Sequence, residues 1–283
     1  MKLCHPTPLT DFSYNNCRLS GQDVCIDCEA LTTRKICAWP EQKQQALARE
    51  LNRFFPAIFK KRKDWEYMVK HFFYLPCGNT IRQIIFARDK DGRLVALCAF
   101  DNGVFHVGSQ KTHLIYVHIR AVLPAFQKLG MGRMFSEKIL STLQPDMLMT
   151  TCVQNTSYFS WLKIQDPDIR KKYSFFPWSD PHGHGKKNIR LPYEDLGFTL
   201  DCFRAIYKSH VKESQTRLDE VINNITVHLI RKGVNTFFDH PKWDENQKKL
   251  SIARYLGVTE KDAILLVIKK RKDGDRELYP AHV

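Results

Sequence analysis

The first part of the chain places apolar residues at helical spacing, and the spacing then shortens to that of strands. In segment 41–58 apolar residues recur every three or four positions, which predicts an amphipathic helix. The stripe consists of Leu47, Leu51, Phe54, Phe55 and Ile58. A similar pattern within 65–73 predicts a second helix. Residues 1–39 show no clear period, so we expect an irregular arm there.

Four apolar segments with strand-like composition follow, and turn signals separate them. The predicted strands are 83–88, 94–100, 104–107 and 112–122. The sequence Asp89-Lys-Asp-Gly92 is typical of a hairpin turn, and Asp101-Asn-Gly103 predicts another. Because such short connections join antiparallel neighbours, these segments predict an antiparallel meander.

The second half of the chain mixes helical and extended patterns. A helix is predicted over 131–143, where the apolar positions are Met131, Met134, Phe135, Ile139 and Leu143. We expect strands at 147–153 and 198–207, a short helix at 158–164, and an irregular insertion at 165–195.

The tail beyond residue 211 carries a further stripe at helical spacing. Its members are Leu218, Val221, Ile222, Ile225 and Leu229. We therefore expect a mainly helical C-terminal extension. The apolar run 263–268 fits either a strand or a helix.

Two glycines lie between a predicted strand and a predicted helix, in segment 122–133. It reads Val-Leu-Pro-Ala-Phe-Gln-Lys-Leu-Gly-Met-Gly-Arg. The start of a helix leaves backbone N–H groups without intrahelical partners, and the helix dipole places positive charge at that end. Glycine also lets phosphate oxygens approach the backbone closely. The segment therefore predicts an anion site.

Composition restricts the class of protein only broadly. The chain has 283 residues, of which 43% are apolar and 26% charged, as in ordinary globular proteins. We expect no membrane span, because no run of eighteen apolar residues exists, and no secretory signal at the N-terminus. Nine cysteines without an export signal favour a reducing, cytoplasmic location.

The formal net charge of +14 is the strongest bulk feature. It favours polyanionic ligands such as nucleotide phosphates, nucleic acid or acidic proteins, but it does not choose among them. A basic protein without any nucleic-acid role is an equally good interpretation.

The order of the predicted elements and the glycine segment together resemble the GCN5-related N-acetyltransferase (GNAT) family. The matching pattern is Val-x-Pro-x-Phe-Gln-x-x-Gly-x-Gly over residues 122–132. The resemblance implies an α/β (α+β) fold with a mixed, mostly antiparallel central sheet flanked by helices. It covers 40–208, with the insertion at 165–195, between the Cys-rich arm 1–39 and the helical extension 209–283.

The resemblance also implies a site for acetyl-CoA, whose acetyl group would pass to an amine acceptor. Backbone N–H groups of the glycine turn would hold the pyrophosphate of CoA. The implied CoA-binding residues are Val122, Gln127, Lys128, Leu129, Gly130, Met131, Gly132, Arg133 and Asn155.

The family's usual glutamate base is missing from the strand before the glycine turn. Tyr116, His118 and Arg120 alternate along this strand, which would place them on one face. His118 is the candidate general base, and a structural, hydrogen-bonded histidine is the equal alternative. The expected tyrosine position of the general acid holds Leu162, so Tyr158 is the candidate acid, although packing is the favoured interpretation of this residue.

Four N-terminal cysteines form a second chemical cluster. They are Cys17, Cys25, Cys28 and Cys37. Four thiolates can bind zinc tetrahedrally, but a second close pair is missing, so free thiols are the favoured interpretation.

The sequence leaves one alternative function open. The missing glutamate, and the long separation of Leu196-Gly-Phe198 from Asn155, fit a basic module that binds CoA or nucleic acid without catalysis. Two histidines at His182-Gly-His184 place a candidate acceptor-recognition loop within the insertion.

Overall fold

The structure is a computed structural model that describes nine stretches of the chain. They are residues 8–19, 22–58, 80–127, 129–152, 155–176, 193–207, 216–220, 227–231 and 262–272. The predicted helix within 65–73, Lys128 and the two histidines of the insertion lie outside them. The chain divides into two compact units, Met1–Val104 with Ile115–Gln144, and Phe105–Leu114 with Pro145–Val283.

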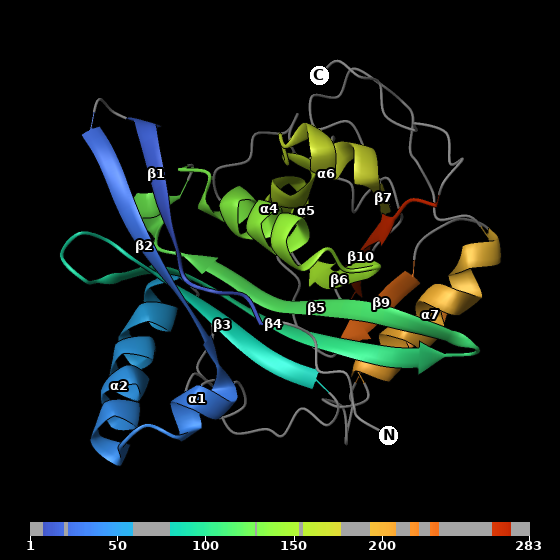
Figure 1. Cartoon of the computed structure of the whole chain (residues 1–283), viewed down its shortest axis with the longest axis horizontal. Coiled ribbons are helices and arrows are strands. Elements are labelled where there is room, and N and C mark those ends of the chain that lie inside the picture. Colours follow the sequence, from blue (N-terminus) through green and yellow to red (C-terminus); the bar gives the residue numbers. More distant parts are fainter. Residues whose placement is uncertain are drawn as a thin grey trace. The chain divides into compact units, whose positions relative to one another are not determined.

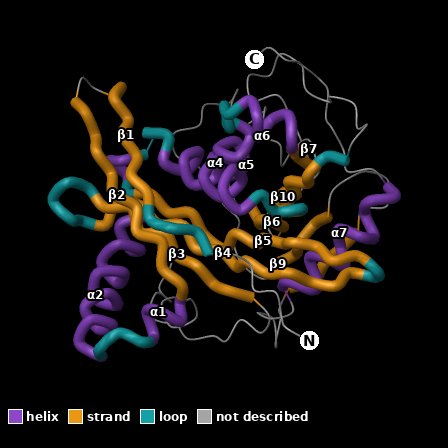
Figure 2. Tube along the Cα trace, in the orientation of Figure 1, coloured by secondary structure: helices purple, strands orange, loops and turns teal. Residues whose placement is uncertain are grey.

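Strands that follow one another in the sequence build the sheet of the first unit. These are β1 (Phe12–Leu19), β2 (Gln22–Thr32), β3 (Thr80–Arg88), β4 (Leu94–Val107) and β5 (Gln110–Val122), in that spatial order. Pairing from β1 through β4 is antiparallel, and these strands lie side by side in Figure 2. The predicted antiparallel pairing of 83–88 with 94–100 is therefore confirmed, and β1 and β2 extend the sheet beyond it.

The prediction that residues 1–39 are irregular is wrong. They contain β1, β2 and the short helix α1 (Thr33–Cys37). Along β2, Ile26, Cys28 and Ala30 are buried. Cys25 and Asp27, which alternate with them along the strand, are exposed. This is the alternation of a half-buried strand, with a cysteine as one of its small apolar members.

The predicted turn at Asp101-Asn-Gly103 is also wrong, because β4 runs through it without a break. Asp101 lies directly opposite Arg82 of β3, and both side chains are buried. The buried ion pair with Arg82 thus gives the Asp101 carboxylate a partner within the strand, although aspartate by itself favours a turn. The predicted turn at Asp89–Gly92 is confirmed: the Gly92 N–H donates to the Asp89 carbonyl over 2.9 Å, and Gly92 has φ +76°.

Two helices cover the strands of the first unit, on opposite sides in Figure 1. Helix α2 (Glu41–Ile58) buries the predicted stripe members Leu47, Leu51, Phe54 and Phe55 in a cluster with residues of β3 and β4. Helix α4 (Met131–Leu143) follows the 3-10 turn η1 (Pro124–Phe126) and buries Met131, Met134, Phe135 and Ile139. Both predicted helices are confirmed.

The second unit has its own antiparallel set of strands. These are β6 (Met147–Cys152), β10 (Asp262–Lys270), β9 (Val227–Arg231) and β8 (Thr216–Glu220) in spatial order, and β7 (Tyr173–Phe176) also pairs with β10. Its helices are α5 (Asn155–Leu162), α6 (Pro167–Lys172) and α7 (Tyr193–Tyr207).

Three predictions fail in this unit. The supposedly irregular insertion 165–195 contains α6, β7 and the start of α7. The predicted strand 198–207 is part of helix α7, in which Thr199, Leu200, Phe203 and Ile206 are buried at helical spacing. The described elements of the C-terminal extension are strands, so β8 and β9 contradict the helical stripe that begins at Leu218, and β10 resolves the open choice for 263–268.

The sheet with its flanking helices is the predicted mixed, mostly antiparallel α+β arrangement, and the fold is GNAT-like. Among the described residues, no helix is both long and apolar enough to span a membrane.

Candidate functional site

The glycine turn opens helix α4 as the sequence predicts. Gly130 is the N-cap residue with φ +77°, in the left-handed region, and as a glycine it has no side chain that could cap the helix start. The backbone N–H groups of the first turn therefore lack the usual side-chain acceptor. An anion that approaches this end meets N–H donors and the positive end of the helix dipole.

The other residues of the turn have distinct roles. The Gln127 side chain donates to the Val122 carbonyl over 3.2 Å, so it links the start and the end of the connection between β5 and α4. Leu129 and Gly130 are half-buried. Arg133 has its Nε 3.9 Å from Glu137, which is a weak contact, so its charge remains near the helix start.

Arg120 ties the first turn of α4 to strand β5. Its Nη1 donates to the Gly132 carbonyl over 3.0 Å and to the Ser136 hydroxyl over 2.7 Å. The Ser136 hydroxyl in turn donates to the Gly132 carbonyl over 2.9 Å. Sequence reasoning gave Arg120 no role here. The only signal was Ser136, a polar residue on the apolar face of a predicted helix.

We expect Arg120→Met to lower the free energy of unfolding by about 1.5–3 kcal/mol, because hydrogen bonds from a charged donor contribute this much. Chemical denaturation measures the change. Arg133→Met is the matched control. We expect it to lower the free energy of unfolding by about 0–1 kcal/mol, because Arg133 makes only a partly exposed ion pair with Glu137. Equal stability of the two variants would contradict the role given to Arg120.

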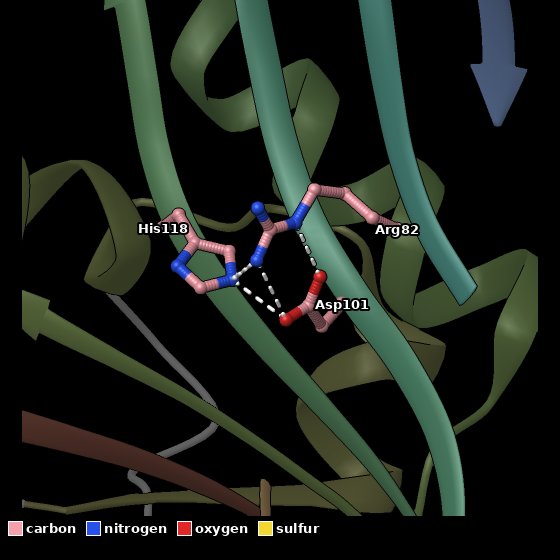
Figure 3. Close-up of polar contacts among 3 residues, drawn as sticks. All are labelled: Arg82, Asp101 and His118. Carbon is pink, nitrogen blue, oxygen red and sulfur yellow. Dashed lines mark hydrogen bonds and ion pairs between the residues drawn. The ribbon is translucent and has the colours of Figure 1, made fainter. Parts of the chain in front are cut away.

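His118 lies in a polar cluster that spans three adjacent strands (Figure 3). Its Nε2 is 2.9 Å from Asp101 Oδ2 and 3.4 Å from Arg82 Nη2. Arg82 donates to Asp101 through Nε over 2.8 Å and through Nη2 over 3.2 Å. The Arg82 and Asp101 side chains are 0% exposed, and that of His118 is 12% exposed.

Tyr116 completes the surroundings of His118. Its buried ring meets the imidazole edge to face, with centroids 4.8 Å apart. Tyr116 and His118 therefore lie together as the sequence predicts, whereas Arg120 bonds to α4 instead. Sequence reasoning missed Arg82 and Asp101, although Arg82 is a charge at the start of an apolar strand.

The residues predicted from the second patch of the family belong to the second unit. Asn155 begins helix α5, and its side chain lies outside the described residues. Tyr158, Trp161 and Leu162 are buried. Burial of Tyr158 agrees with the packing alternative, and its role as an acid stays a prediction.

The N-terminal cysteines do not form a metal site in the part of the chain that the structure describes. Cys25 and Cys28 lie on β2, where one is exposed and the other buried, so their thiols face opposite sides of the strand. Burial raises the pKa of the Cys28 thiol to about 12, with a smaller contribution from Asp27. Cys37, the last residue of α1, is exposed, and the Cys17 side chain is outside the described residues.

Comparison with known proteins gives matches only among solved structures. No family model matches the chain, and no curated protein sequence does. An arylalkylamine N-acetyltransferase of the yellow fever mosquito is 10% identical, with 58% of this chain and 82% of that chain covered at a TM-score of 0.38. An aminoglycoside acetyltransferase from an uncultured soil sample is 13% identical, with coverage of 59% and 95% and a TM-score of 0.35.

A third structure is a GNAT family acetyltransferase from Brucella melitensis in complex with acetyl-CoA. It is 17% identical, with 44% of this chain and 74% of that chain covered at a TM-score of 0.30. Because these TM-scores are below 0.5, the likeness to these structures carries no argument about function, which has to come from the residues of this chain. The structural neighbours are GNAT-fold acetyltransferases, and the order of strands, glycine turn and helices described above gives this chain a GNAT-like fold.

Proposed function

We propose that the protein is an acyl-CoA-dependent N-acyltransferase that moves an acetyl group from acetyl-CoA to a primary amine. The observation that carries the proposal is the start of α4, where the N-cap residue Gly130 has φ +77° and no side chain of its own to cap the helix. The strand before this turn carries His118, the candidate base. His118 and Gly130 lie in the same unit, in which His118 would accept the proton and the start of α4 would bind the diphosphate.

The residues of the turn fit the diphosphate of CoA. The N–H groups of residues 128–133 would donate to its oxygens, with Gly130 and Gly132 allowing close approach. Lys128 and Arg133 would add positive charge. Val122, at the end of β5, would contact the pantetheine arm.

The chemistry requires one proton acceptor and one proton donor. The amine nitrogen forms a bond to the acetyl carbonyl carbon, the carbon–sulfur bond breaks, and the CoA sulfur leaves with the electron pair. His118 would take the proton that the amine loses. A general acid or a water molecule would provide the proton that the departing thiolate gains. The acceptor class is an amine of a protein, a small molecule or an RNA-linked group, and the charge of +14 favours acidic surroundings for it.

Thermal unfolding with separate ligands tests the proposal. We expect acetyl-CoA and CoA to raise the unfolding temperature, because a ligand at about 100 times its Kd stabilises the native state by about 2.7 kcal/mol. Release of free CoA thiol with a panel of amines then identifies the acceptor. A rise in unfolding temperature with nucleic acid alone would contradict the proposal and favour a binding module.

One observation favours nucleic acid as a second candidate ligand. The basic runs 170–172 and 269–272 lie side by side in the second unit, since the Arg271 N–H donates to the Lys172 carbonyl over 2.8 Å. The register of β7 with β10 sets Lys270 opposite Tyr173. Seven cations from distant parts of the sequence therefore gather there, and Lys171, Lys172, Lys270 and Lys272 are exposed.

Nucleic-acid binding should depend on this basic surface and not on the glycine turn. We expect the double substitution Lys171→Glu/Lys270→Glu to weaken binding at low salt and to lower the salt slope by about 1–2, since each lost phosphate contact reduces it by about 0.7–0.9. The charge-matched control is Lys35→Glu/Lys90→Glu, at exposed positions of the first unit. Equal losses in both variants would show that overall charge, and not this surface, is responsible.

A further inference from the structure

We infer that Asp101 is a positioning residue that holds His118 with its proton on Nε2, so that Nδ1 is the atom that takes the proton from the amine. Arg82 keeps the Asp101 carboxylate ionised for this purpose. The role in the reaction rests on the proposed function. The position of the proton on the imidazole rests on geometry alone.

The two contacts of His118 Nε2 make opposite demands on that nitrogen. A carboxylate only accepts hydrogen bonds, so the 2.9 Å contact with Asp101 requires a proton on Nε2. A guanidinium only donates, so the 3.4 Å contact with Arg82 would require a lone pair there. The shorter contact is near the ideal length for a hydrogen bond and the longer one is near the limit. The Nε2–H tautomer therefore satisfies the stronger interaction.

The alternative, a protonated Asp101 that donates to Nε2, conflicts with the position of Arg82. Arg82 is always charged and makes two contacts with the carboxylate, at 2.8 and 3.2 Å. Both side chains are fully buried. A neutral Asp101 would remove the negative charge from this buried ion pair, and breaking a buried pair is strongly destabilising. Asp101 therefore stays ionised and accepts from Nε2.

The direction of the imidazole follows from this arrangement. Figure 3 shows Nε2 turned toward Asp101 and Arg82, and Nδ1 turned away from both. Nε2 lies against the buried side chains of Arg82 and Asp101, and the His118 side chain as a whole is 12% exposed. The edge-to-face contact with Tyr116 limits rotation of the ring. In the Nε2–H form the lone pair of the ring is on Nδ1, so Nδ1 is the nitrogen that would take a proton from a substrate amine.

Spectroscopy of the wild-type protein tests the tautomer directly. Long-range ¹H–¹⁵N spectra of the full-length chain with labelled histidine distinguish the two neutral forms, and His118→Gln assigns the signal by its disappearance. We expect a neutral His118 with the proton on Nε2. A neutral His118 with its proton on Nδ1 would overturn the inference, whatever the activity of the protein.

Kinetics then test the positioning role. In Asp101→Asn the residue can donate to Nε2 and so stabilise the wrong tautomer, and we expect kcat to fall on the order of 10²-fold with KM for acetyl-CoA unchanged. Asp91→Asn, at an exposed turn position, should keep wild-type kcat. Asp101→Glu, which keeps the carboxylate and its pairing with Arg82, should recover part of the lost kcat.

The outcomes separate the inference from the proposed function. Folded Asp101→Asn with wild-type kcat would overturn the positioning role. If His118→Gln keeps full turnover while the wild-type signal shows the Nε2–H form, the base assignment fails and the tautomer inference stands. If Asp101→Asn does not fold, two measurements still decide the inference: the tautomer of His118 in the wild-type protein and the kcat of Asp101→Glu. A folded Asp101→Glu variant without turnover would contradict the inference, because this variant keeps the carboxylate.

Discussion

A Gly130→Val variant will lose about 100-fold or more of the affinity for acetyl-CoA. Gly130 has φ +77°, a conformation that costs an L-residue roughly 1–2 kcal/mol and more for a β-branched one. A side chain there would also keep phosphate oxygens away from the backbone N–H groups of the first turn of α4. Loss of two charge-assisted hydrogen bonds, at about 1.5–3 kcal/mol each, gives this loss of affinity. Titration calorimetry with acetyl-CoA measures it.

Gly92 offers a matched control for backbone strain. It has φ +76°, and a Cβ added there would have no neighbour within 4 Å. We expect Gly92→Val to lose stability as Gly130→Val does, because both force the same strained conformation. Only the Gly130 variant should lose affinity. Wild-type affinity in Gly130→Val, or an equal loss in both variants, would rule out the glycine turn as the CoA site.

A His118→Gln variant will turn over acetyl-CoA about 10²- to 10⁴-fold more slowly, because a positioned general base contributes this much to a rate. The glutamine side chain can still donate a hydrogen bond to the buried Asp101 carboxylate, so we expect the variant to fold. We expect affinity for acetyl-CoA to stay near the wild-type value, since the glycine turn is unchanged. Initial rates of thiol release between about pH 5 and 8 measure the effect across the range in which an ordinary imidazole changes charge.

His106→Gln is the control for this variant. His106 lies exposed on β4, and we expect its replacement to leave turnover unchanged. If His118→Gln kept wild-type turnover at every pH, His118 would be a structural histidine, the alternative that the sequence left open.

Local sequence signals were enough to predict several elements of the first unit, including the helix that follows the glycine turn. The stripe of α2, the turn at Asp89–Gly92 and the helix that begins at Met131 each depend on residues within a few positions of one another. Their side chains and backbone preferences specify them before any tertiary contact forms. The predicted anion site follows from the same local information.

The polar cluster around His118 could not be predicted in this way. Arg82 and Asp101 meet only because β3 and β4 pair in one register, and the local sequence Asp101-Asn-Gly103 by itself favours a turn. The pairing across strands outweighs the local preference. Histidine chemistry makes His118 a candidate from the sequence alone, whereas no local signal points to Asp101, which contacts it.

The failed predictions in the second unit have a similar cause. Leu218 and Leu229 fit a helical stripe by their spacing, yet they face each other across the paired strands β8 and β9. In α7, Gly197 and the β-branched Thr199 reduce local helix propensity, and burial of Leu200, Phe203 and Ile206 overrides it. Contacts distant in sequence determine both elements.

A crystal structure of the protein with acetyl-CoA tests the central claim most directly. The account predicts pyrophosphate oxygens within hydrogen-bonding distance of the backbone N–H groups at the start of α4, between Leu129 and Arg133. It also predicts that the thioester lies on the side of His118 that carries Nδ1. Acetyl-CoA bound away from Gly130, for example at the basic runs of the second unit, would contradict it.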